Sequence, residues 1–266
     1  MPVSNQNTNT RGNSFIENML SVLIPAHNEE QEISGTIHDL VNILDREKID
    51  HEVLIVNDNS TDRTREVLDG LSSKFAAVRY VNNTPPNGYG HAVKAGLKTF
   101  RGECVAIVMA DGSDDPEDLV RFYRKWAEGY DCVFGNRFSD QSRVIDYPWP
   151  KLCLNRLGNY LIRLIFNMDY TDTTNAFKLY GRNVIAGLTP LESSGFNLTI
   201  EMPLKAVIRD YKFAVISCNW YNRKQGMSKW KINETVGGYF SIIFNCRAEQ
   251  KKRHDGDRKS SWTPTK

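Results

Sequence analysis

Short, continuous apolar runs alternate with amphipathic helical patterns through the first half of the chain. The run MLSVLIPA comes first, and residues 29–44 then repeat apolar side chains at the spacing of one helix face (Ile33, Ile37, Leu40, Val41 and Leu44). HEVLIVND, AAVRYVNN, CVAIVMA and YDCVFGNRF repeat the strand pattern, with helices predicted after Thr61, over 88–98 and over 116–128. Apolar strands that alternate with such helices are typical of a mostly parallel sheet covered on both faces, so the sequence predicts an α/β fold.

Polar segments follow four of these five predicted strands. The segments are PAHNEE, NDNSTD, MADGSDD and GNRF. Ligands of such sheets bind beyond the carboxyl ends of the strands, where these four segments converge. Polar loops are common at any surface, but four of them at one sheet edge favour a binding site.

The second half of the chain has a different pattern. Residues 150–168 predict an amphipathic helix, with one face formed by Leu154, Leu157, Leu161, Leu164, Ile165 and Met168, and another by Lys151, Asn155, Asn159 and Arg163. The apolar face has two interpretations: it covers the sheet, or it lies in a lipid interface with Trp149 near its start. YKFAVISCN predicts another strand, and a last helix carries Ile232, Val236, Tyr239 and Ile243.

The ends of the chain are predicted to be separate from the folded domain. Residues 1–17 are polar and too poor in apolar side chains to offset the entropy of ordering, so we expect a disordered tail. The domain spans 18–232, with a nucleotide-sugar half at 18–137 and an acceptor half at 138–232. Residues 233–266 form a C-terminal helix and a basic tail, whose charged end we expect to be frayed.

Composition narrows the class of protein. The 266 residues include 34 Lys and Arg against 32 Asp and Glu, and this near balance argues against nucleic-acid binding. Five cysteines without CxxC spacing, in a chain without a signal peptide, predict free thiols in the cytoplasm. The apolar stretches are broken by charge before the about 18 residues that a membrane span needs, so any membrane contact would be peripheral, at the cytoplasmic face.

Six motifs in fixed order carry a family resemblance. They are VLIPAHNEE, EVLIVNDNSTDRT, GYGHAVKAGL, MADGSDDPEDL, GNRF and DTTNAFKLYGR. Together they resemble glycosyltransferase family 2, and within it the enzymes that transfer sugars to dolichyl or polyprenyl phosphate, over residues 20–232. The resemblance implies a GT-A fold and an inverting hexosyl transfer from a UDP- or GDP-sugar, with Mg²⁺ or Mn²⁺ on the diphosphate.

The resemblance places the nucleotide at the ends of the first two strands. The residues that it implies around the base are Pro25, Ala26, Asn28 and Glu29. Asp58 is implied to accept hydrogen bonds from the base or the ribose, a role that suits a carboxylate at a strand end. The alternative for Asp58 is a turn residue or a helix cap. Asn57 departs from the family's usual Asp-Asp pair, and Gly88 and Gly90 alone indicate only close helix packing.

The family's Asp-x-Asp metal motif is only half present. Asp111 matches its second aspartate, but Met109 replaces the first, so we expect weak metal binding before the donor arrives. Ser113 is the second implied metal ligand. Asp114 is either a further ligand or a solvated turn residue, whereas Asp115, which precedes a proline, is predicted to cap the next helix.

A set of polar and cationic residues is expected to bind the acceptor or its phosphate. Its members are Arg137, Lys151, Asn155, Arg156, Arg223 and Lys229. Arg137 matches a family arginine that faces phosphate, and Lys151 and Asn155 stand where the family has an Arg and a Ser that hold the lipid phosphate. Arg223 and Lys229 belong to RKQGMSKWK, which is similar to a basic loop that closes over the diphosphate.

The acceptor decides whether a general base is needed. A hydroxyl acceptor needs one, whereas a phosphate monoester is already largely dianionic near pH 7. Glu201 is a candidate base, with a structural partner for a nearby arginine as the alternative, and Asp172 is expected to support the acceptor loop. Because anion-binding residues outnumber clear bases, the sequence favours a polyprenyl phosphate acceptor. The alternatives are a glycan or other hydroxyl acceptor, and a nucleotide-sugar-binding protein with impaired catalysis.

Overall fold

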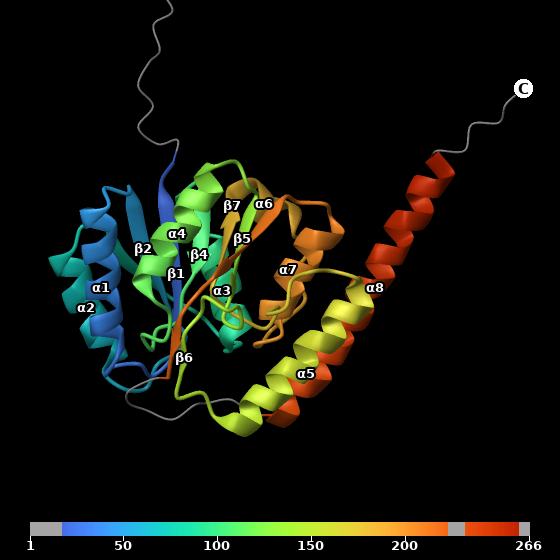
Figure 1. Cartoon of the computed structure of the whole chain (residues 1–266). Helices are drawn as coiled ribbons and strands as arrows, with labels where there is room; N and C mark the ends of the chain where they lie inside the picture. The colour runs from blue at the N-terminus through green and yellow to red at the C-terminus, as the bar shows by residue number, and fades with distance from the viewer. Residues whose placement is uncertain (1–17, 223–231, 261–266) are drawn as a thin grey trace, which may run out of the picture.

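A twisted seven-stranded sheet forms the centre of the computed structural model, which describes residues 18–222 and 232–260 and, within the last helix, the side chains of 237–253 (Figure 1). The strand order is β3-β2-β1-β4-β7-β5-β8. The strands are β1 (Leu20–Ala26), β2 (His51–Asn57), β3 (Val78–Asn82), β4 (Cys104–Ile107), β5 (Cys132–Asn136), β7 (Lys178–Gly181) and β8 (Phe213–Ser217). Strand β7 runs antiparallel to β4 and β5 and the other pairs are parallel, which confirms the predicted mostly parallel α/β sheet.

Helices cover both faces of this sheet because successive strand residues point to opposite sides. Val22 and Ile24 of β1 pack in one core, with α1 (Ile33–Arg46), α2 (Thr64–Lys74) and α4 (Pro116–Ala127). Leu23 packs in the other core, with α3 (Tyr89–Leu97), α6 (Arg182–Gly187) and α7 (Leu198–Ile208). The strands are therefore apolar on both faces, as their continuous runs predicted.

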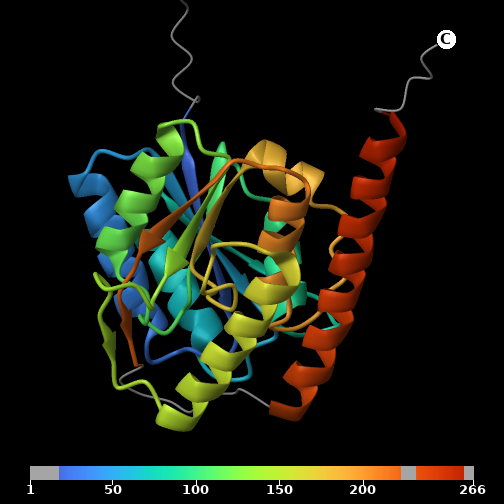
Figure 2. The same ribbon diagram turned by 45° about the vertical axis from the view of Figure 1, so that its right-hand side comes forward.

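Two long helices, α5 (Trp149–Phe166) and α8 (Ile232–Ser260), lie side by side beyond α7 (Figures 1 and 2). Helix α8 continues to Ser260, so the prediction of a frayed segment from residue 249 is wrong over that range. The predicted tail 1–17 lies outside the described residues. In the described part of the chain, no helix has both the length and the apolarity to cross a membrane.

The leucine stripe of α5 faces outward. Leu157 and Leu164 are 56% and 59% exposed, whereas Asn159, Ile162 and Phe166 are buried. The interpretation in which the leucine stripe covers the sheet is therefore wrong, except at Met168, which is buried just beyond the helix.

A second, two-stranded sheet lies beside the main one and was not predicted. Strand β6 (Val144–Ile145) pairs in parallel with β9 (Trp220–Tyr221), and Asp114 forms an isolated bridge with Trp220. The bridge connects the MADGSDD segment to the acceptor half of the chain.

The chain reverses direction across the sheet at β1, which has β2 on one side and β4 on the other. Helix α1 follows β1 on one face, and α3 precedes β4 on the opposite face. Ligands of open α/β sheets bind beyond the strand ends at such a switch point, and in this chain that position lies at the segments that follow Ala26, Asn57 and Ile107.

Candidate active site

The segments that follow β1 and β2 are fastened to each other. The Asn28 amide donates to Ser60 Oγ at 3.0 Å, and Thr61 N donates to Asn28 Oδ1 at 2.7 Å. Glu29 N donates to Thr64 Oγ1 at 2.9 Å. Asn28 has a φ of 53°, in the left-handed region that asparagine tolerates better than most residues. Pro25 and Ala26 end β1 directly beside these bonds, so the predicted base-binding residues share one edge of the sheet.

Asp58 ties the β2 end to the start of α3. Its Oδ1 accepts from Asn83 Nδ2 at 2.7 Å, and its Oδ2 accepts from Gly88 N at 2.8 Å. The helix start is held closely, because a Cβ at Gly90 would lie 2.6 Å from the carbonyl carbon of Ser194. The close packing expected of the glycine pair is confirmed. Asp58 thus has a structural role between β2 and α3, and its nucleotide role stays a prediction.

The acidic loop, residues 109–115, follows β4 and is unusually buried. Asp111 is 9% exposed and its Oδ1 accepts from Ser113 N at 3.2 Å. Asp114 Oδ2 accepts from Met109 N at 2.9 Å, which closes the loop. Asp115 caps α4 through Glu117 N, which confirms the predicted helix cap.

Asp114 is a buried carboxylate rather than a solvated turn residue. Its pKa is raised to about 7, mainly by burial and in part by the charge of the neighbouring Asp111, against the lowering effects of the Met109 amide and Arg137. These interactions place Asp111, Asp114 and Arg137 in one electrostatic neighbourhood.

The donor set of the acidic loop fits a hard divalent cation. Asp111 and Asp114 supply carboxylate oxygens and Ser113 supplies a hydroxyl, which are the ligand types that Mg²⁺ and Mn²⁺ take in proteins. Among the described residues, no group of three or more His, Cys, Asp and Glu side chains could hold a metal ion. The loop therefore fits a metal that completes its coordination with substrate oxygens and water.

Arg137 is locked to Asp172 at the end of β5. The Arg137 backbone N and Nε each donate to Asp172 Oδ2 at 2.9 Å, and Nη2 donates to Oδ1 at 2.8 Å. Both side chains are buried, and the guanidinium also lies over the rings of Phe138 and Tyr147. The ion pair is thus an interior one, and Asp172 neutralises the cation that was expected to meet a phosphate.

The inner face of α5 binds the segment that follows Asp172. Asn155 Nδ2 donates to Thr174 Oγ1 at 2.8 Å, and Asn159 Nδ2 donates to the same oxygen at 2.9 Å. Lys151 lies over the Tyr147 ring and Arg156 over the Phe138 ring. Four of the six predicted acceptor residues therefore surround one corner of the sheet, whereas Arg223 and Lys229 lie outside the described residues.

Glu201 is not placed to act as a general base. Its side chain is fully buried, with Oε1 accepting from Glu192 N and Oε2 from Ser193 N, both at 2.8 Å. Lys205 Nζ lies 2.6 Å from Oε1. Burial opposes the charge, but the Lys205 ion pair and the two amides outweigh it and hold the pKa of Glu201 below its usual value. Glu201 is therefore in a structural ion pair, as in the alternative interpretation, but its partner is Lys205 and not the expected arginine.

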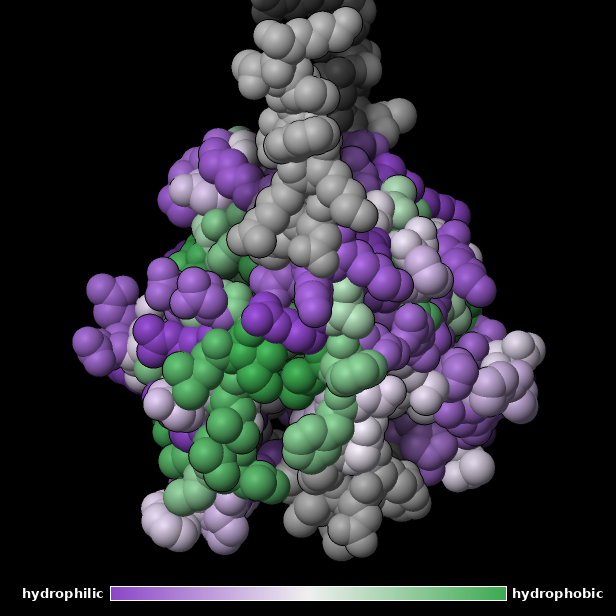
Figure 3. All heavy atoms as spheres, turned by 90° about the vertical axis from the view of Figure 1, so that its right-hand side faces the viewer, coloured by the Kyte–Doolittle hydropathy of each residue, from purple (hydrophilic) through white to green (hydrophobic). Residues whose placement is uncertain are grey.

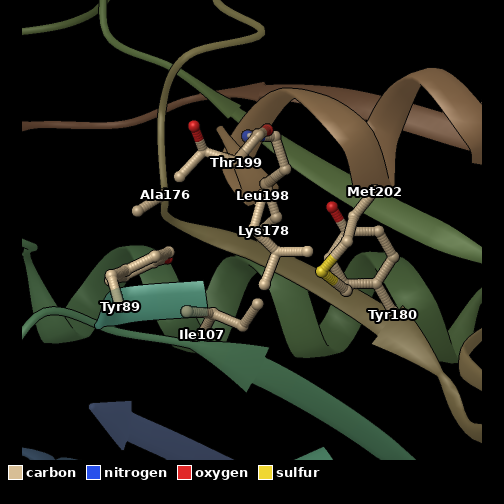
Figure 4. Close-up of a pocket in the computed structure, with 8 residues that line it drawn as sticks. All are labelled: Tyr89, Ile107, Ala176, Lys178, Tyr180, Leu198, Thr199 and Met202. Atoms are coloured by element: carbon tan, nitrogen blue, oxygen red, sulfur yellow. Dashed lines mark hydrogen bonds between the residues drawn. The ribbon is translucent and has the colours of Figure 1, made fainter. Parts of the chain in front are cut away.

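A buried lysine beside the site was missed in the sequence. Lys178 Nζ donates to the carbonyl oxygens of Thr173 at 3.0 Å, of Thr199 at 3.2 Å and of Asn175. Figure 4 shows Lys178 in a small pocket with Tyr89. Burial lowers the pKa of Lys178 to about 7. The signal in the sequence was a lysine inside an otherwise apolar strand, AFKLYG.

The family is decided by the match of the sequence to glycosyl transferase family 2 over residues 21–188, which include the β1 and β2 ends, the acidic loop and Arg137. The chain belongs to this family. The protein is therefore a glycosyltransferase, and the segments at the strand ends are the family's motifs in their folded arrangement.

Several known proteins are similar to this glycosyltransferase. The polyprenol monophosphomannose synthase of Mycolicibacterium smegmatis is 28% identical over 217 residues, which are 78% of this chain and 79% of the relative. The glycosyltransferase AglJ of Haloferax volcanii is 28% identical over 77% of this chain and 64% of its own length. Among solved structures, glucosyl-3-phosphoglycerate synthase of Mycobacterium tuberculosis, in complex with Mn²⁺, UDP and phosphoglyceric acid, has a TM-score of 0.66 at 17% identity, over 88% of this chain and 78% of that one. The GT-A fold is thereby confirmed.

Proposed function

We propose that this family 2 enzyme is an inverting, metal-dependent transferase that moves a sugar from a UDP- or GDP-sugar to a polyprenyl phosphate. The observation that carries the proposal is the buried acidic loop with Asp111, at the switch point of a GT-A sheet and at the same sheet edge as the segment that contains Asp58. The relative from Mycolicibacterium smegmatis supports the lipid phosphate by its name, and the Mycobacterium tuberculosis structure supports UDP and Mn²⁺.

The donor lies across the carboxyl ends of β1, β2 and β4. Asn28 and Glu29 border the base together with Pro25 and Ala26, and Asp58 accepts from the base or ribose. Asp111 and Ser113 would hold a divalent ion, with Asp114 in the same loop. When bound, Mg²⁺ or Mn²⁺ neutralises charge on the departing nucleoside diphosphate.

The acceptor approaches from the corner formed by α5 and residues 171–175. Lys151 and Arg156 supply positive charge there, and Asn155 fixes Thr174. An acceptor phosphate oxygen attacks the anomeric carbon, forming a C–O bond as the bond to the diphosphate oxygen breaks, so the anomeric configuration inverts once. Arg137 and Asp172 act as positioning residues, because their charges neutralise each other.

The state of Glu201 bears on the choice of acceptor. A hydroxyl acceptor needs a general base within hydrogen-bond reach, and the residue that best suited this role in the sequence is buried in an ion pair. A phosphate acceptor needs no base, because its monoester is already largely dianionic near pH 7. The buried Glu201 therefore supports the lipid phosphate over the glycan or other hydroxyl acceptor.

A second candidate function is a nucleotide-sugar-binding protein with impaired catalysis. Met109, in the place of the first aspartate of the metal motif, is the feature that favours it. The buried Asp111 and Asp114 oppose it, because the acidic loop keeps two carboxylates in one electrostatic neighbourhood.

The test offers a panel of nucleotide sugars with short polyprenyl phosphates and, in parallel, with the matching polyprenols, each with and without Mn²⁺. We expect sugar transfer to the phosphates alone, dependent on the metal. Transfer to polyprenols alone would overturn the acceptor assignment, and nucleotide binding without any turnover would favour the binding protein.

A further inference from the structure

Helix α5 buries Asn159, Ile162 and Phe166 but turns its widest apolar stripe outward. Asn155 and Asn159 bond to Thr174 on the inner side. The large apolar side chains that face outward are Leu154, Leu157, Tyr160, Leu161, Leu164 and Ile165, between 38% and 59% exposed. At 100° per residue these positions cover an arc of about 140°, and no charged residue falls within it. A surface helix of a soluble protein has the opposite arrangement.

Helix α8 extends this apolar surface. Phe240 and Phe244, one turn apart, are 68% and 74% exposed, and α8 packs beside α5. Figure 3 shows apolar side chains gathered in one patch on the side of the molecule that these helices form. We call the outward faces of the two helices the α5/α8 surface. Soluble monomers rarely expose so large a contiguous apolar patch, so the surface calls for an apolar partner.

Positive charge flanks the α5/α8 surface. The sequence of α5 contains no Asp or Glu, and Arg156 and Arg163 lie at one edge of its apolar arc. On α8, Arg247 and Lys251 continue the line of Phe240 and Phe244 at three- and four-residue spacing, and both are exposed. A second copy of the chain would bring these like charges together, whereas an anionic lipid surface is complementary to them.

We propose that the α5/α8 surface docks on an anionic lipid bilayer, with both helices along the membrane plane. The leucines and phenylalanines would enter the boundary between headgroups and acyl chains, and the flanking cations would meet lipid phosphates. Trp149, 73% exposed at the start of α5, suits the same boundary.

Docking would place the acceptor corner at the lipid surface, because the other face of α5 holds Thr174. This consequence rests on the proposed function, but docking itself does not. Vesicles that contain neither donor nor acceptor therefore test docking alone, and their outcome is separate from that of the transfer assay.

The experiment is co-sedimentation of the full chain with phosphatidylcholine vesicles, with and without phosphatidylglycerol. We expect binding to the vesicles that contain phosphatidylglycerol, and a loss of at least about tenfold in affinity for the double variant Leu157→Gln, Leu164→Gln. Arg247→Gln with Lys251→Gln should reduce the preference for anionic vesicles. Val215→Gln, at an exposed apolar side chain of β8, is the matched control and should bind as the parent does.

Failure of the parent chain to bind, or equal binding by the double leucine variant, would overturn the proposal. Light scattering after size exclusion tests whether the α5/α8 surface instead binds a second copy of the chain. The docking proposal would be overturned if the parent were a dimer that does not bind vesicles and if the double leucine variant were a monomer. Thermal unfolding and nucleotide binding of each variant verify that it is folded.

Discussion

Arg137 and Asp172, 35 residues apart in the chain, form a buried two-pronged ion pair at the end of β5. Burial works against the charge on Arg137, but Asp172 outweighs it and keeps the pKa of the guanidinium above its usual value. The pair fixes the segment that Asn155 and Asn159 of α5 also bind through Thr174. The acceptor corner is thus a preorganised unit rather than a set of free cations.

Replacing Asp172 by Asn should leave a buried, unpaired charge on Arg137. We expect a loss of about 3–5 kcal/mol in the free energy of unfolding, measured by urea denaturation. The double variant Arg137→Met, Asp172→Leu should lose less than the two single variants combined, because no charge remains buried alone. A loss under about 1 kcal/mol for Asp172→Asn would mean that water reaches the pair.

Glu201→Gln tests a structural role against a catalytic one. The pKa of Glu201 is lowered in the folded state, so its stabilisation is fully present above the unfolded value and is lost as the pH falls through the folded value. We expect the variant to be about 3–5 kcal/mol less stable than the parent at pH 7, and the difference to shrink as the pH falls below the usual glutamate range. Under conditions where both are folded, kcat should be similar, whereas a general base would cost at least about 100-fold.

Asp58→Ala should weaken nucleotide binding. The carboxylate holds Gly88 and Asn83 at the edge of the predicted base site, so its loss removes both a nucleotide contact and the position of α3. We expect the Kd for UDP or GDP, measured calorimetrically, to rise at least about tenfold, equivalent to about 1.4 kcal/mol. Asp69→Ala, at an exposed residue of α2, is the control. An unchanged Kd would leave Asp58 with a structural role alone.

Met109→Asp should restore the carboxylate that the metal motif lacks. The Met109 amide already bonds to Asp114, and a side-chain carboxylate at position 109 would join those of Asp111 and Asp114. We expect a lower Kd for Mn²⁺ in the absence of donor, because the affinity of such sites rises with ligand charge. Electron paramagnetic resonance, which distinguishes free from bound Mn²⁺, measures this Kd. Weaker binding than in the parent would show that position 109 points away from the ion.

The sequence predicted the features that depend on local pattern. The apolar runs became β1, β2, β4 and β5, and the Asp115-Pro116 pair marked the start of α4. The location of the polar site segments was predictable as well, because parallel strands bring their carboxyl ends to one edge of the sheet.

Features that depend on distant contacts were not predictable. Periodicity showed that α5 has an apolar face, but only the bonds of Asn155 and Asn159 to Thr174 decide that this face points outward. Glu201 resembled a base because the sequence does not show that Lys205 and the amides of Glu192 and Ser193 surround it. Strands β6 and β9 have two residues each, too few to form a periodic pattern.

The central claim is that Asp111, through a divalent ion, assists departure of the nucleoside diphosphate. The most direct measurement is the rate of nucleoside diphosphate release from the active donor with Mn²⁺, for Asp111→Asn beside Asp115→Asn, a control from the same loop in which the asparagine oxygen can still cap α4. We predict a loss of at least about 100-fold for Asp111→Asn, with weakened Mn²⁺ binding, and a change within about threefold for Asp115→Asn. Release by Asp111→Asn at the rate of the parent enzyme would contradict the claim.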